Sequence, residues 1–389
     1  MKLLYFIPSL YNPGGMERVL TEKVNYLVDI LGYDITIITT EQLGRSCFFP
    51  LSDKVKLINL DIDFNKHYNL NYLIQIISHY TKLRLYKKNA QNILNNIKPD
   101  ICISLCGKEI EFLYKLKNII PKIAEIHFAM NIRKQFIMAR KCGVFWEIIG
   151  KIRTAQLKSS IRKFDRLVVL TSQDNKQWEK SQNNITLIPN PNPLKGDQIS
   201  AVQNKRVITV GRLDAQKGYD LLIEVWGIVA EKHPDWILDI YGQGEWQDFL
   251  NNKIKYLNLI SKINLMGTSK NIESEYLDSS IFVMSSRYEG FGMVLLEAMS
   301  CGLPVISFDC QYGPSELIVD GENGFLIPPN DVKELAGKLC LLIENLEIRK
   351  KMSIKAKEYS KKYEISKIMK QWDSLFKSIT YKNEKIITN

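Results

Sequence analysis

The stretch RYEGFGMVLLEAMSCGLPV, residues 287–305, combines two glycines, an apolar run and a third glycine followed closely by proline. Gly290 and Gly292 are typical of a turn, so the sequence predicts that a helix begins at Gly292 or the next residue and continues through MVLLEAMS. Gly302 is expected to end this helix, and Pro304 prevents it from resuming. The stretch therefore predicts a loop, a short helix and a new strand, which is a unit of α/β folds.

Two glutamates flank the predicted start of this helix. Glu289 is expected on the loop, and Glu297, eight residues later, in the second helical turn. A helix N-terminus favours an anion such as a diphosphate, and the two carboxylates would then accept hydrogen bonds from hydroxyl groups, Glu297 from a ribose and Glu289 from a sugar. A helix cap with a salt-bridged glutamate is the simpler alternative. The backbone N–H groups expected to meet the anion are those of Gly292, Met293, Val294 and Leu295.

The rest of the sequence repeats the alternation of short apolar runs and longer amphipathic runs. Short runs of β-branched and aliphatic residues between helical patterns predict parallel sheets covered on both faces. The tail from Asp331 to about Ile379 has a helical pattern. The expected strands are LLYFI, DITIITT, VKLINL, DICISL, PKIAEIHF and DRLVVLT in the first half, and RVITVG, WILDIYG, INLMG, IFVMSS, PVISFD and GFLIPP in the second.

A proline-rich segment, IPNPNP at residues 188–193, cannot continue a helix or a central strand. It is predicted to link two doubly wound Rossmann-like domains, and a chain of 389 residues is long enough for two. The expected division is an N-terminal domain at 1–190, a second domain at 191–362 and a C-terminal helix at 363–380. Because ligands bind at the carboxyl ends of such strands, the expected site is a central cleft between the domains.

The composition is that of a globular protein, with 45% hydrophobic and 24% charged residues. No apolar run reaches the length of about 18 residues that a membrane span needs. The start, MKLLYFIPSLYNPGG, has no small-residue cleavage site and is interpreted as a buried strand, not as a signal peptide. Seven cysteines without a C-x-x-C pair favour reduced thiols and a cytoplasmic location.

The net charge of +11 is concentrated in the first half of the chain. Residues 1–190 hold 28 lysines and arginines against 16 aspartates and glutamates, whereas residues 191–389 hold 25 against 26. Within residues 131–166, ten basic and two acidic residues are interleaved with Phe, Ile and Trp. This segment fits either an anionic membrane surface at the inner face or an ordinary solvated helix pair, and both interpretations stay open. No recognisable nucleic-acid motif accompanies the charge, so no nucleic-acid partner is expected.

Two loops of the first domain carry candidate residues. Gly14 and Gly15 precede a predicted helix, where backbone N–H groups can approach an anion, although a tight βα turn is the alternative. His127 lies within Glu-Ile-His-Phe, residues 125–128, at the end of a predicted strand and at the edge where a ligand is expected. A single histidine is more often structural than functional, so spacing alone does not assign it a role.

One loop of the second domain, VGRLDAQKG at residues 210–218, holds two cations. Arg212 and Lys217, close to Gly211, could neutralise a diphosphate and the charge that develops when a bond to it breaks. As an isolated pair they would be solvated surface charges, so this interpretation depends on the helix at Gly292.

Together these motifs resemble those of the large retaining glycosyltransferase family 4, which has the GT-B architecture of two Rossmann-like domains facing a central cleft. The resemblance covers most of the chain. It rests on GGMERVL near the start, GRLDAQKGYDLLIEVW at the opening of the second domain, and SSRYEGFGMVLLEAMSCGLPVISFD followed by GPSELIVDGENGFLIPPND. The third block contains the Glu-x7-Glu signature of the family, Glu289 and Glu297.

The resemblance implies donor-binding roles for the second domain. Arg212 and Lys217, beside Gly211, would bind the diphosphate of a nucleotide sugar, Glu289 would contact the transferred sugar, and Glu297 would hold the ribose. Backbone N–H groups would come from Phe291, Gly292, Met293, Val294 and Leu295.

In the first domain, the resemblance implies that Gly14 and Gly15 line the cleft near the donor phosphates and the acceptor. His127 matches the active-site histidine of the family, and with Glu289, Arg212 and Lys217 it forms the expected catalytic set. The closing helices around 363–376 would cross back onto the first domain.

The resemblance also implies the reaction. A hexose or N-acetylhexosamine would pass from a nucleotide diphosphate sugar, with UDP favoured, to a glycan or lipid-linked acceptor in surface polysaccharide or lipopolysaccharide synthesis. Configuration at the anomeric carbon would be retained, because the leaving diphosphate, stabilised by Arg212, Lys217 and the helix dipole, takes the acceptor proton on the same face. No protein nucleophile, metal or other cofactor is expected. Asp61 and Asp63 resemble the metal-binding D-x-D pair of other glycosyltransferases, but they lie away from every matched motif and are attributed to chance.

Three alternatives share this architecture. A sugar-nucleotide epimerase would interconvert nucleotide sugars without an acceptor. A phosphorylase would need a lysine that carries pyridoxal phosphate, which no segment suggests. A nucleotide-sugar-binding scaffold that has lost its chemistry would leave donor and acceptor unchanged.

Overall fold

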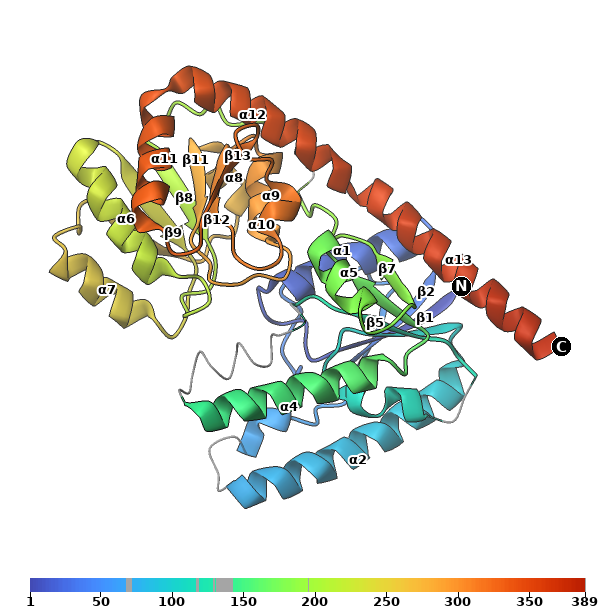
Figure 1. Cartoon of the computed structure of the whole chain (residues 1–389). Coiled ribbons are helices and arrows are strands. Elements are labelled where there is room, and N and C mark those ends of the chain that lie inside the picture. Colours follow the sequence, from blue (N-terminus) through green and yellow to red (C-terminus); the bar gives the residue numbers. More distant parts are fainter. Residues whose placement is uncertain (68–71, 117–118, 129, 131–142, 195, 389) are drawn as a thin grey trace. The chain divides into compact units, whose positions relative to one another are not determined.

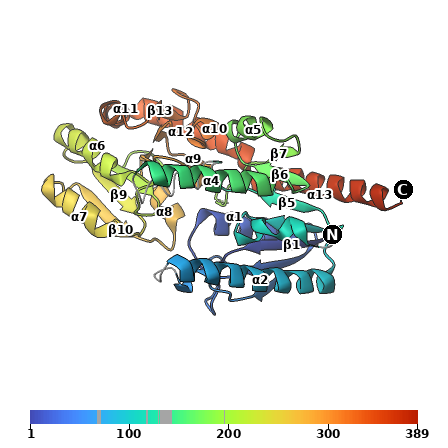
Figure 2. The same cartoon turned by 60° about the horizontal axis from the view of Figure 1, so that its bottom comes forward.

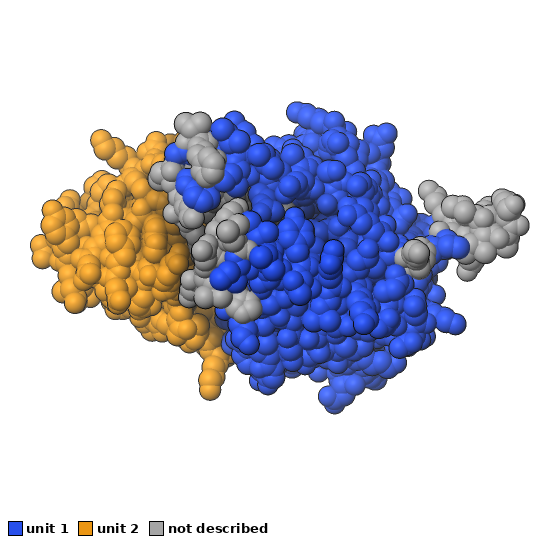
Figure 3. Space-filling model, turned by 90° about the horizontal axis from the view of Figure 1, so that it is seen from below, with its two compact units in different colours: residues 1–191, 365–389 blue, residues 192–364 orange. Residues whose placement is uncertain are grey.

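The computed structural model describes residues 1–388 except 68–71, 117–118, 129, 131–142 and 195. It divides into two compact units, which Figure 3 shows in different colours. Unit 1 consists of Met1–Pro191 with Ile365–Asn389, and unit 2 of Asn192–Glu364. The chain therefore passes between the units twice, and the first crossing lies within the proline-rich segment at 188–193.

Unit 1 is built on a parallel sheet of seven strands in the order β3-β2-β1-β4-β5-β6-β7. Its middle strands are buried on both faces, as expected for continuous apolar runs in a parallel sheet. The strands predicted from LLYFI to DRLVVLT are present, but the sequence does not predict β7, because its three residues are too few to form a recognisable run. The bounds are β1 Lys2–Ile7, β2 Asp34–Thr39, β3 Lys56–Asn59, β4 Ile101–Ser104, β5 Lys122–Glu125, β6 Arg166–Val169 and β7 Ile185–Leu187.

Helices cover both faces of the unit 1 sheet. On one face, α1 (Gly15–Asp29) and α13 (Ile365–Thr388) pack against alternate residues of the central strands. On the other face lie α2 (Tyr72–Ile97), α4 (Val144–Ile161) and α5 (Ser172–Glu179). In Figure 1, α2 and α4 both run along the lower side of the sheet, and in Figure 2, where this side comes forward, both lie in front. Helix α13, longer than the helix expected at 363–380, therefore packs in unit 1, although the segment before it belongs to unit 2.

Short 3₁₀ segments complete the description of unit 1. They are η1 Phe64–His67, η2 Lys108–Glu111 and η3 Leu113–Lys115. The basic segment predicted at 131–166 is described only in part, because residues 131–142 lie outside the described residues. Of the helices in the described part of the chain, none is both long and apolar enough to cross a membrane.

Unit 2 contains a parallel sheet of six strands in the order β10-β9-β8-β11-β12-β13. Its largest core cluster joins α6, α7 and α11 to one face of this sheet, whereas α9 contacts β11 and β12 from outside this cluster. All six strands predicted for this half are present. The strands are β8 Arg206–Val210, β9 Ile237–Tyr241, β10 Ile263–Gly267, β11 Ile281–Met284, β12 Val305–Phe308 and β13 Gly324–Ile327. The helices are α6 Tyr219–Lys232, α7 Gln247–Tyr256, α8 Ile272–Leu277, α9 Met293–Ser300, α10 Pro314–Leu317, α11 Val332–Glu344, α12 Leu346–Ser360 and the 3₁₀ segment η4 Lys361–Tyr363.

The strand order of unit 2 reverses direction between β8 and β11. Along the chain, β9 and β10 follow on one side of β8, and β11 to β13 then follow on the other side. Residues 211–218 and 285–292 therefore leave the sheet at the carboxyl ends of two adjacent strands. Doubly wound sheets form their ligand sites at such a switch point, so the topology brings the two motif loops of unit 2 to one place.

Candidate active site

The two motif loops of unit 2 are joined by hydrogen bonds that end on backbone carbonyls. The Arg287 N–H donates to the Gln216 carbonyl over 2.8 Å, and the Gln216 side-chain amide donates to the Tyr288 carbonyl over 3.0 Å. The Ser285 hydroxyl donates to the Lys217 carbonyl over 2.9 Å. The sequence stretches that carry Lys217 and Glu289, predicted separately, thus form one rigid surface.

Lys217 and Glu289 form an ion pair at the centre of this surface. The Lys217 Nζ lies 2.7 Å from Glu289 Oε1, and the Ser286 hydroxyl donates to the same oxygen over 2.6 Å. The two side chains are 13% and 8% exposed, so the pair is largely shielded but still reaches solvent. The nearby Glu289 carboxylate adds to burial in raising the pKa of the Cys310 thiol, which is therefore neutral. A partly buried cation and carboxylate of this kind can each exchange a protein contact for a ligand contact.

At three glycines near this ion pair, other backbone or side-chain atoms lie so close that a Cβ would not fit. A Cβ on Gly211 would lie 2.8 Å from Lys217 Cε, so a side chain there would displace the lysine stem. Gly218 has a φ of +64°, and a Cβ on it would meet the Ser285 carbonyl oxygen at 2.1 Å. A Cβ on Gly242 would lie 1.8 Å from the Gly211 oxygen. The position of Lys217 is therefore fixed by backbone packing as well as by its ion pair.

Helix α9 begins where the sequence predicts. Gly292 is its N-cap, with a φ of +87° that favours glycine, and no side chain caps the helix. Met293 and Val294 in its first turn are half-buried, whereas Phe291 and Leu295 are buried. The first turn thus presents uncapped backbone N–H groups beside a partly exposed surface, which favours an anion.

Glu297 lies on the buried side of α9. It is 5% exposed and accepts a hydrogen bond from the Tyr276 hydroxyl of α8 over 3.1 Å. Its carboxylate therefore already has a protein partner, which offsets part of the cost of burial. The sequence interpretation assigns a role to Glu297 but none to Tyr276 or Ser286. Ser286 lies within the third matched block, whereas Tyr276 lies in none of the three blocks.

Arg212 differs from Lys217 in its exposure. Its side chain is 70% exposed and lies 3.3 Å from Asp214 Oδ2 and 3.0 Å from Gln216 Oε1, both within its own loop. The guanidinium group is therefore free to move at little cost, whereas the Lys217 ammonium is held in place. Both cations lie on the same loop. In the described contacts Lys217 pairs with Glu289, whereas Arg212 pairs with Asp214.

The other predicted site residues belong to unit 1. Gly14 is the N-cap of α1 in extended conformation, and Gly15 begins that helix. His127 follows β5, and its Nε2 lies 2.9 Å from Glu125 Oε1. The His127 and Glu125 side chains are 5% and 1% exposed. Glu125 is itself paired with Lys23 of α1, a residue that the sequence interpretation did not include.

Two further features of unit 1 bear on the expected site. The Asp61 carboxylate accepts a hydrogen bond from the Leu43 N–H over 2.7 Å, and Asp63 belongs to the same irregular loop. Among the described residues, no group of three or more His, Cys, Asp and Glu side chains is arranged to hold a metal ion.

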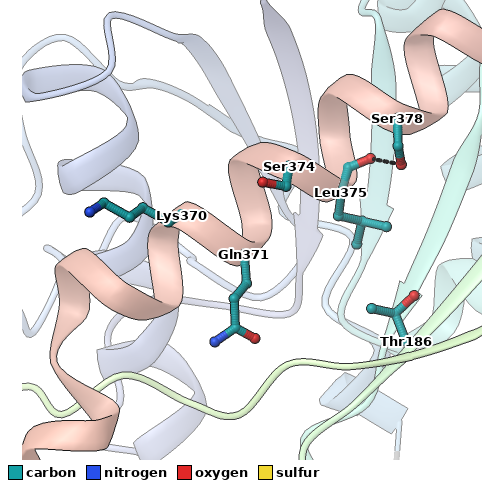
Figure 4. A pocket seen from close by; sticks show the side chains of 6 residues that line it. All are labelled: Thr186, Lys370, Gln371, Ser374, Leu375 and Ser378. Atoms are coloured by element: carbon teal, nitrogen blue, oxygen red, sulfur yellow. Dashed lines mark hydrogen bonds between the residues drawn. The ribbon is translucent and has the colours of Figure 1, made fainter.

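Figure 4 shows a pocket between β7 and α13, which contains none of the predicted site residues. Its lining residues are Thr186, Lys370, Gln371, Ser374, Leu375 and Ser378.

Comparison with known sequences identifies relatives along nearly the whole chain. An uncharacterized glycosyltransferase of Haemophilus influenzae is 30% identical over 379 residues, which cover 96% of this chain and 99% of that protein. The amylovoran biosynthesis glycosyltransferase AmsD of Erwinia amylovora is 27% identical over 96% of this chain and 99% of its own. An α-1,4-N-acetyl-D-galactosaminyltransferase of Campylobacter jejuni, named for a diNAcBac-PP-undecaprenol acceptor, is 26% identical over 97% and 99%.

Solved structures share the fold. A Staphylococcus aureus TarM variant, in complex with fondaparinux, alpha-GlcNAc-glycerol and UDP, superposes with a TM-score of 0.76 at 19% identity, over 96% of this chain and 99% of that chain. Sucrose-phosphate synthase of Thermosynechococcus elongatus gives a TM-score of 0.80 at 16% identity, over 97% and 98%. Residues 194–359, within unit 2, match the family described as glycosyl transferases group 1. The chain belongs to this family, the retaining glycosyltransferases of family 4, and has their GT-B fold.

Proposed function

We propose that this glycosyltransferase moves a hexose or N-acetylhexosamine from a UDP-linked donor to a glycan or lipid-linked acceptor in the synthesis of a surface polysaccharide. The observation that carries the proposal is the ion pair of Lys217 and Glu289 beside the uncapped first turn of α9. A cation and a helix N-terminus on one rigid surface suit a diphosphate. The TarM complex with UDP supports a UDP-linked donor, whose base is uracil.

In this proposal, Lys217 and the N–H groups of Gly292, Met293 and Val294 bind the donor diphosphate, and Arg212 closes on it from the exposed side. The Leu295 N–H, which the sequence also suggested as a donor, already donates to the Gly292 carbonyl over 2.9 Å. Their charge stabilises the diphosphate more as it leaves than while it is still bound to the sugar, because its negative charge increases as the bond breaks. Both described hydrogen bonds of Glu289 end on Oε1, which leaves Oε2 to accept a hydrogen bond from a sugar hydroxyl. Glu297, which already accepts a hydrogen bond from the Tyr276 hydroxyl, also accepts hydrogen bonds from the ribose hydroxyls.

In unit 1, His127 hydrogen-bonds the transferred sugar, and the turn at Gly14 and Gly15 approaches the donor phosphates. The acceptor proton passes to the leaving diphosphate oxygen on the same face of the sugar, which retains the configuration. The chemistry then needs neither a protein nucleophile nor a metal, because cations and backbone dipoles supply the electrostatic stabilisation.

A lipid-linked acceptor is supported by the outer surface of unit 1. Helix α2 exposes Ile74, Ile77 and Tyr80 by 49%, 66% and 63%, and α4 exposes Ile148 and Ile152 by 50% and 52%. Exposed basic residues accompany them, namely Arg84, Lys87, Lys88, Lys151 and Arg153. Apolar side chains flanked by lysine and arginine are typical of a surface that binds anionic lipids. The Campylobacter relative, named for an undecaprenol-linked acceptor, agrees with a substrate held at a membrane.

Co-sedimentation with phosphatidylglycerol vesicles tests this surface. Binding at low salt is expected to weaken when Ile74, Ile77 and Tyr80 are changed together to serine, and to weaken with rising salt. A matched control changes Tyr256 and Ile260 of unit 2, which are 85% and 66% exposed, to serine. A protein that ignores anionic vesicles at low salt, or equal losses in the two variants, would remove the argument for a membrane-bound acceptor.

A thermal-shift panel tests the donor. UDP, GDP and ADP, and the UDP-linked sugars, are each added to the whole protein, because a ligand that binds the native state raises Tm by mass action. UDP and one or more UDP-sugars are expected to give the largest shifts. A larger shift with GDP or ADP would mean that the donor carries that nucleotide instead of UDP. In a separate assay, interconversion of UDP-sugars without any acceptor would favour an epimerase.

A further inference from the structure

Lys23 is a lysine in an apolar position. Helix α1 buries Val19, Leu20, Val24 and Leu27 against the unit 1 sheet, and Lys23 lies among them with an exposure of 0%. Lysine is almost never fully buried without a partner, because the loss of hydration of its charge is costly. The presence of a charge at this position therefore requires a specific counterpart.

Three side chains surround the Lys23 ammonium. It donates a hydrogen bond to Glu125 Oε2 at the end of β5, and the two side chains are each 1% exposed. It also lies 3.8 Å from the ring centroid of Trp372 and 5.2 Å from that of Tyr5. The cation is thus enclosed by one carboxylate and two aromatic rings, an arrangement that stabilises a charge away from water.

Glu125 is the link between Lys23 and the candidate active-site histidine. Burial raises the pKa of its carboxyl, but Lys23 and His127 outweigh this effect and bring the pKa down to about 2. Burial lowers the pKa of Lys23, and Glu125 opposes that change. While Oε2 receives Lys23, Oε1 lies 2.9 Å from His127 Nε2. Each oxygen of the carboxylate therefore has its own partner.

We propose that Lys23 and Glu125 are positioning residues that hold His127 with its proton on Nε2 and its Nδ1 as the hydrogen-bond acceptor. This inference rests on the proposed function, in which His127 contacts the sugar. An ionised carboxylate accepts from Nε2–H and so fixes both the tautomer and the direction of the ring. Without Lys23, Glu125 would be buried without its counter-charge and its carboxylate would no longer be held in place, so the ring would lose this restraint.

The contribution of Trp372 adds a second role for α13. This helix follows the second crossing of the chain from unit 2, and the ring of its Trp372, which is part of the unit 1 core, lies over the ammonium. The C-terminal helix therefore takes part in the electrostatic environment of His127 as well as in the core of unit 1.

The test uses the whole protein with Lys23→Met and Glu125→Gln combined. Each single change leaves a charge buried and unpaired, whereas the combination is neutral and keeps the shapes, so it is expected to fold. Lys23→Arg keeps the charge as a conservative variant. Lys122→Met is the matched control, because Lys122 is also buried, with 6% exposure, but lies at the opposite end of β5 and donates to the Ile120 carbonyl.

Two readouts separate positioning from a merely structural role. Proton–nitrogen correlation spectra of protein labelled with ¹⁵N-histidine show the tautomer of each of the four histidines, and His127→Gln identifies the signal of His127. In the wild type and in Lys122→Met this signal is expected to show the proton on Nε2. In the double variant it is expected to show a mixture, with kcat reduced by about 10–100-fold and the donor KM changed far less.

The outcomes are distinct. A folded double variant with the wild-type His127 signal and wild-type kcat would overturn the inference, as would an equal change in Lys122→Met. If the wild type transfers no sugar from any donor, the proposed function fails, and the spectra of the same variants then still decide whether Lys23 and Glu125 set the tautomer.

Discussion

Two lysine–glutamate pairs, one in each unit, use the same charges in different surroundings. Lys23 and Glu125 are each 1% exposed, and aromatic rings enclose the lysine. Lys217 and Glu289 are 13% and 8% exposed and lie beside the first turn of α9. The enclosed pair is shielded from solvent, and in the proposed function it acts through its neighbour His127. The accessible pair can exchange its contacts for those of a substrate, and this difference separates a positioning role from a binding role.

The largest effect is expected when each pair is broken by the same substitution. Lys23→Met should lower the free energy of unfolding by about 3–5 kcal/mol, because Glu125 is left charged and buried. Lys217→Met should lower it by less, about 1–3 kcal/mol, since Glu289 keeps the Ser286 hydroxyl as a partner and is in part reached by solvent. Urea unfolding followed by tryptophan fluorescence measures both. Similar losses in the two variants would mean that the pairs do not differ in the way their exposure indicates.

The next largest effect is expected on UDP affinity when Glu297 of α9 is changed. Glu297→Ala removes hydrogen bonds to the ribose and should weaken UDP binding by about 1–3 kcal/mol in isothermal titration calorimetry. Tyr276→Phe is the companion variant, because it removes the protein partner of Glu297 and keeps the carboxylate. UDP affinity that is unchanged in Glu297→Ala would exclude the ribose contact.

The glycine at the start of α9 should affect stability by a smaller amount. Gly292→Ala forces a φ of +87° on a residue with a Cβ, which costs about 1–2 kcal/mol. Gly337→Ala is a control of opposite sign, because Gly337 lies within α11 with open space around it, and alanine there should stabilise by about 0.5–1 kcal/mol. Thermal unfolding of both variants measures the difference, and a neutral Gly292→Ala would show that the cap tolerates side chains.

The smallest effect on stability is expected at the exposed cation. Arg212→Ala should change the free energy of unfolding by no more than about 0.5 kcal/mol, because the side chain is 70% exposed. The same variant should still weaken UDP binding, with an effect that shrinks as salt is added. If stability falls and UDP affinity does not, Arg212 is a structural residue and not a donor-binding one.

The sequence predicts the surroundings of α9 well, because they depend on local signals. Gly292, Gly302 and Pro304 each restrict the backbone at their own position, and the helix at Met293–Ser300 follows from them. The meeting of Lys217 and Glu289 depends instead on the order of strands. It is predictable only through the rule that the loops of a doubly wound sheet gather at its carboxyl edge.

The contacts of His127 could not be predicted from the sequence, because they too depend on the tertiary fold and not on local signals. Lys23, Glu125 and Trp372 come from three distant segments, and no local pattern joins α1 to α13. One signal was present, since Lys23 lies three residues from Leu20 and four from Leu27 on the apolar face of its helix. A lysine in such a position indicates a buried partner, although it does not identify it.

In the proposed function Lys217 stabilises the leaving diphosphate, and the kinetics of Lys217→Met measure this contribution. Donor binding is measured by calorimetry with UDP, and turnover with the donor and acceptor that the wild type uses. The account predicts that kcat falls by about 10²–10³-fold while the Kd for UDP rises much less, because the charge on the diphosphate is greatest in the transition state. Equal losses in kcat and in UDP affinity, or an unchanged kcat, would contradict it.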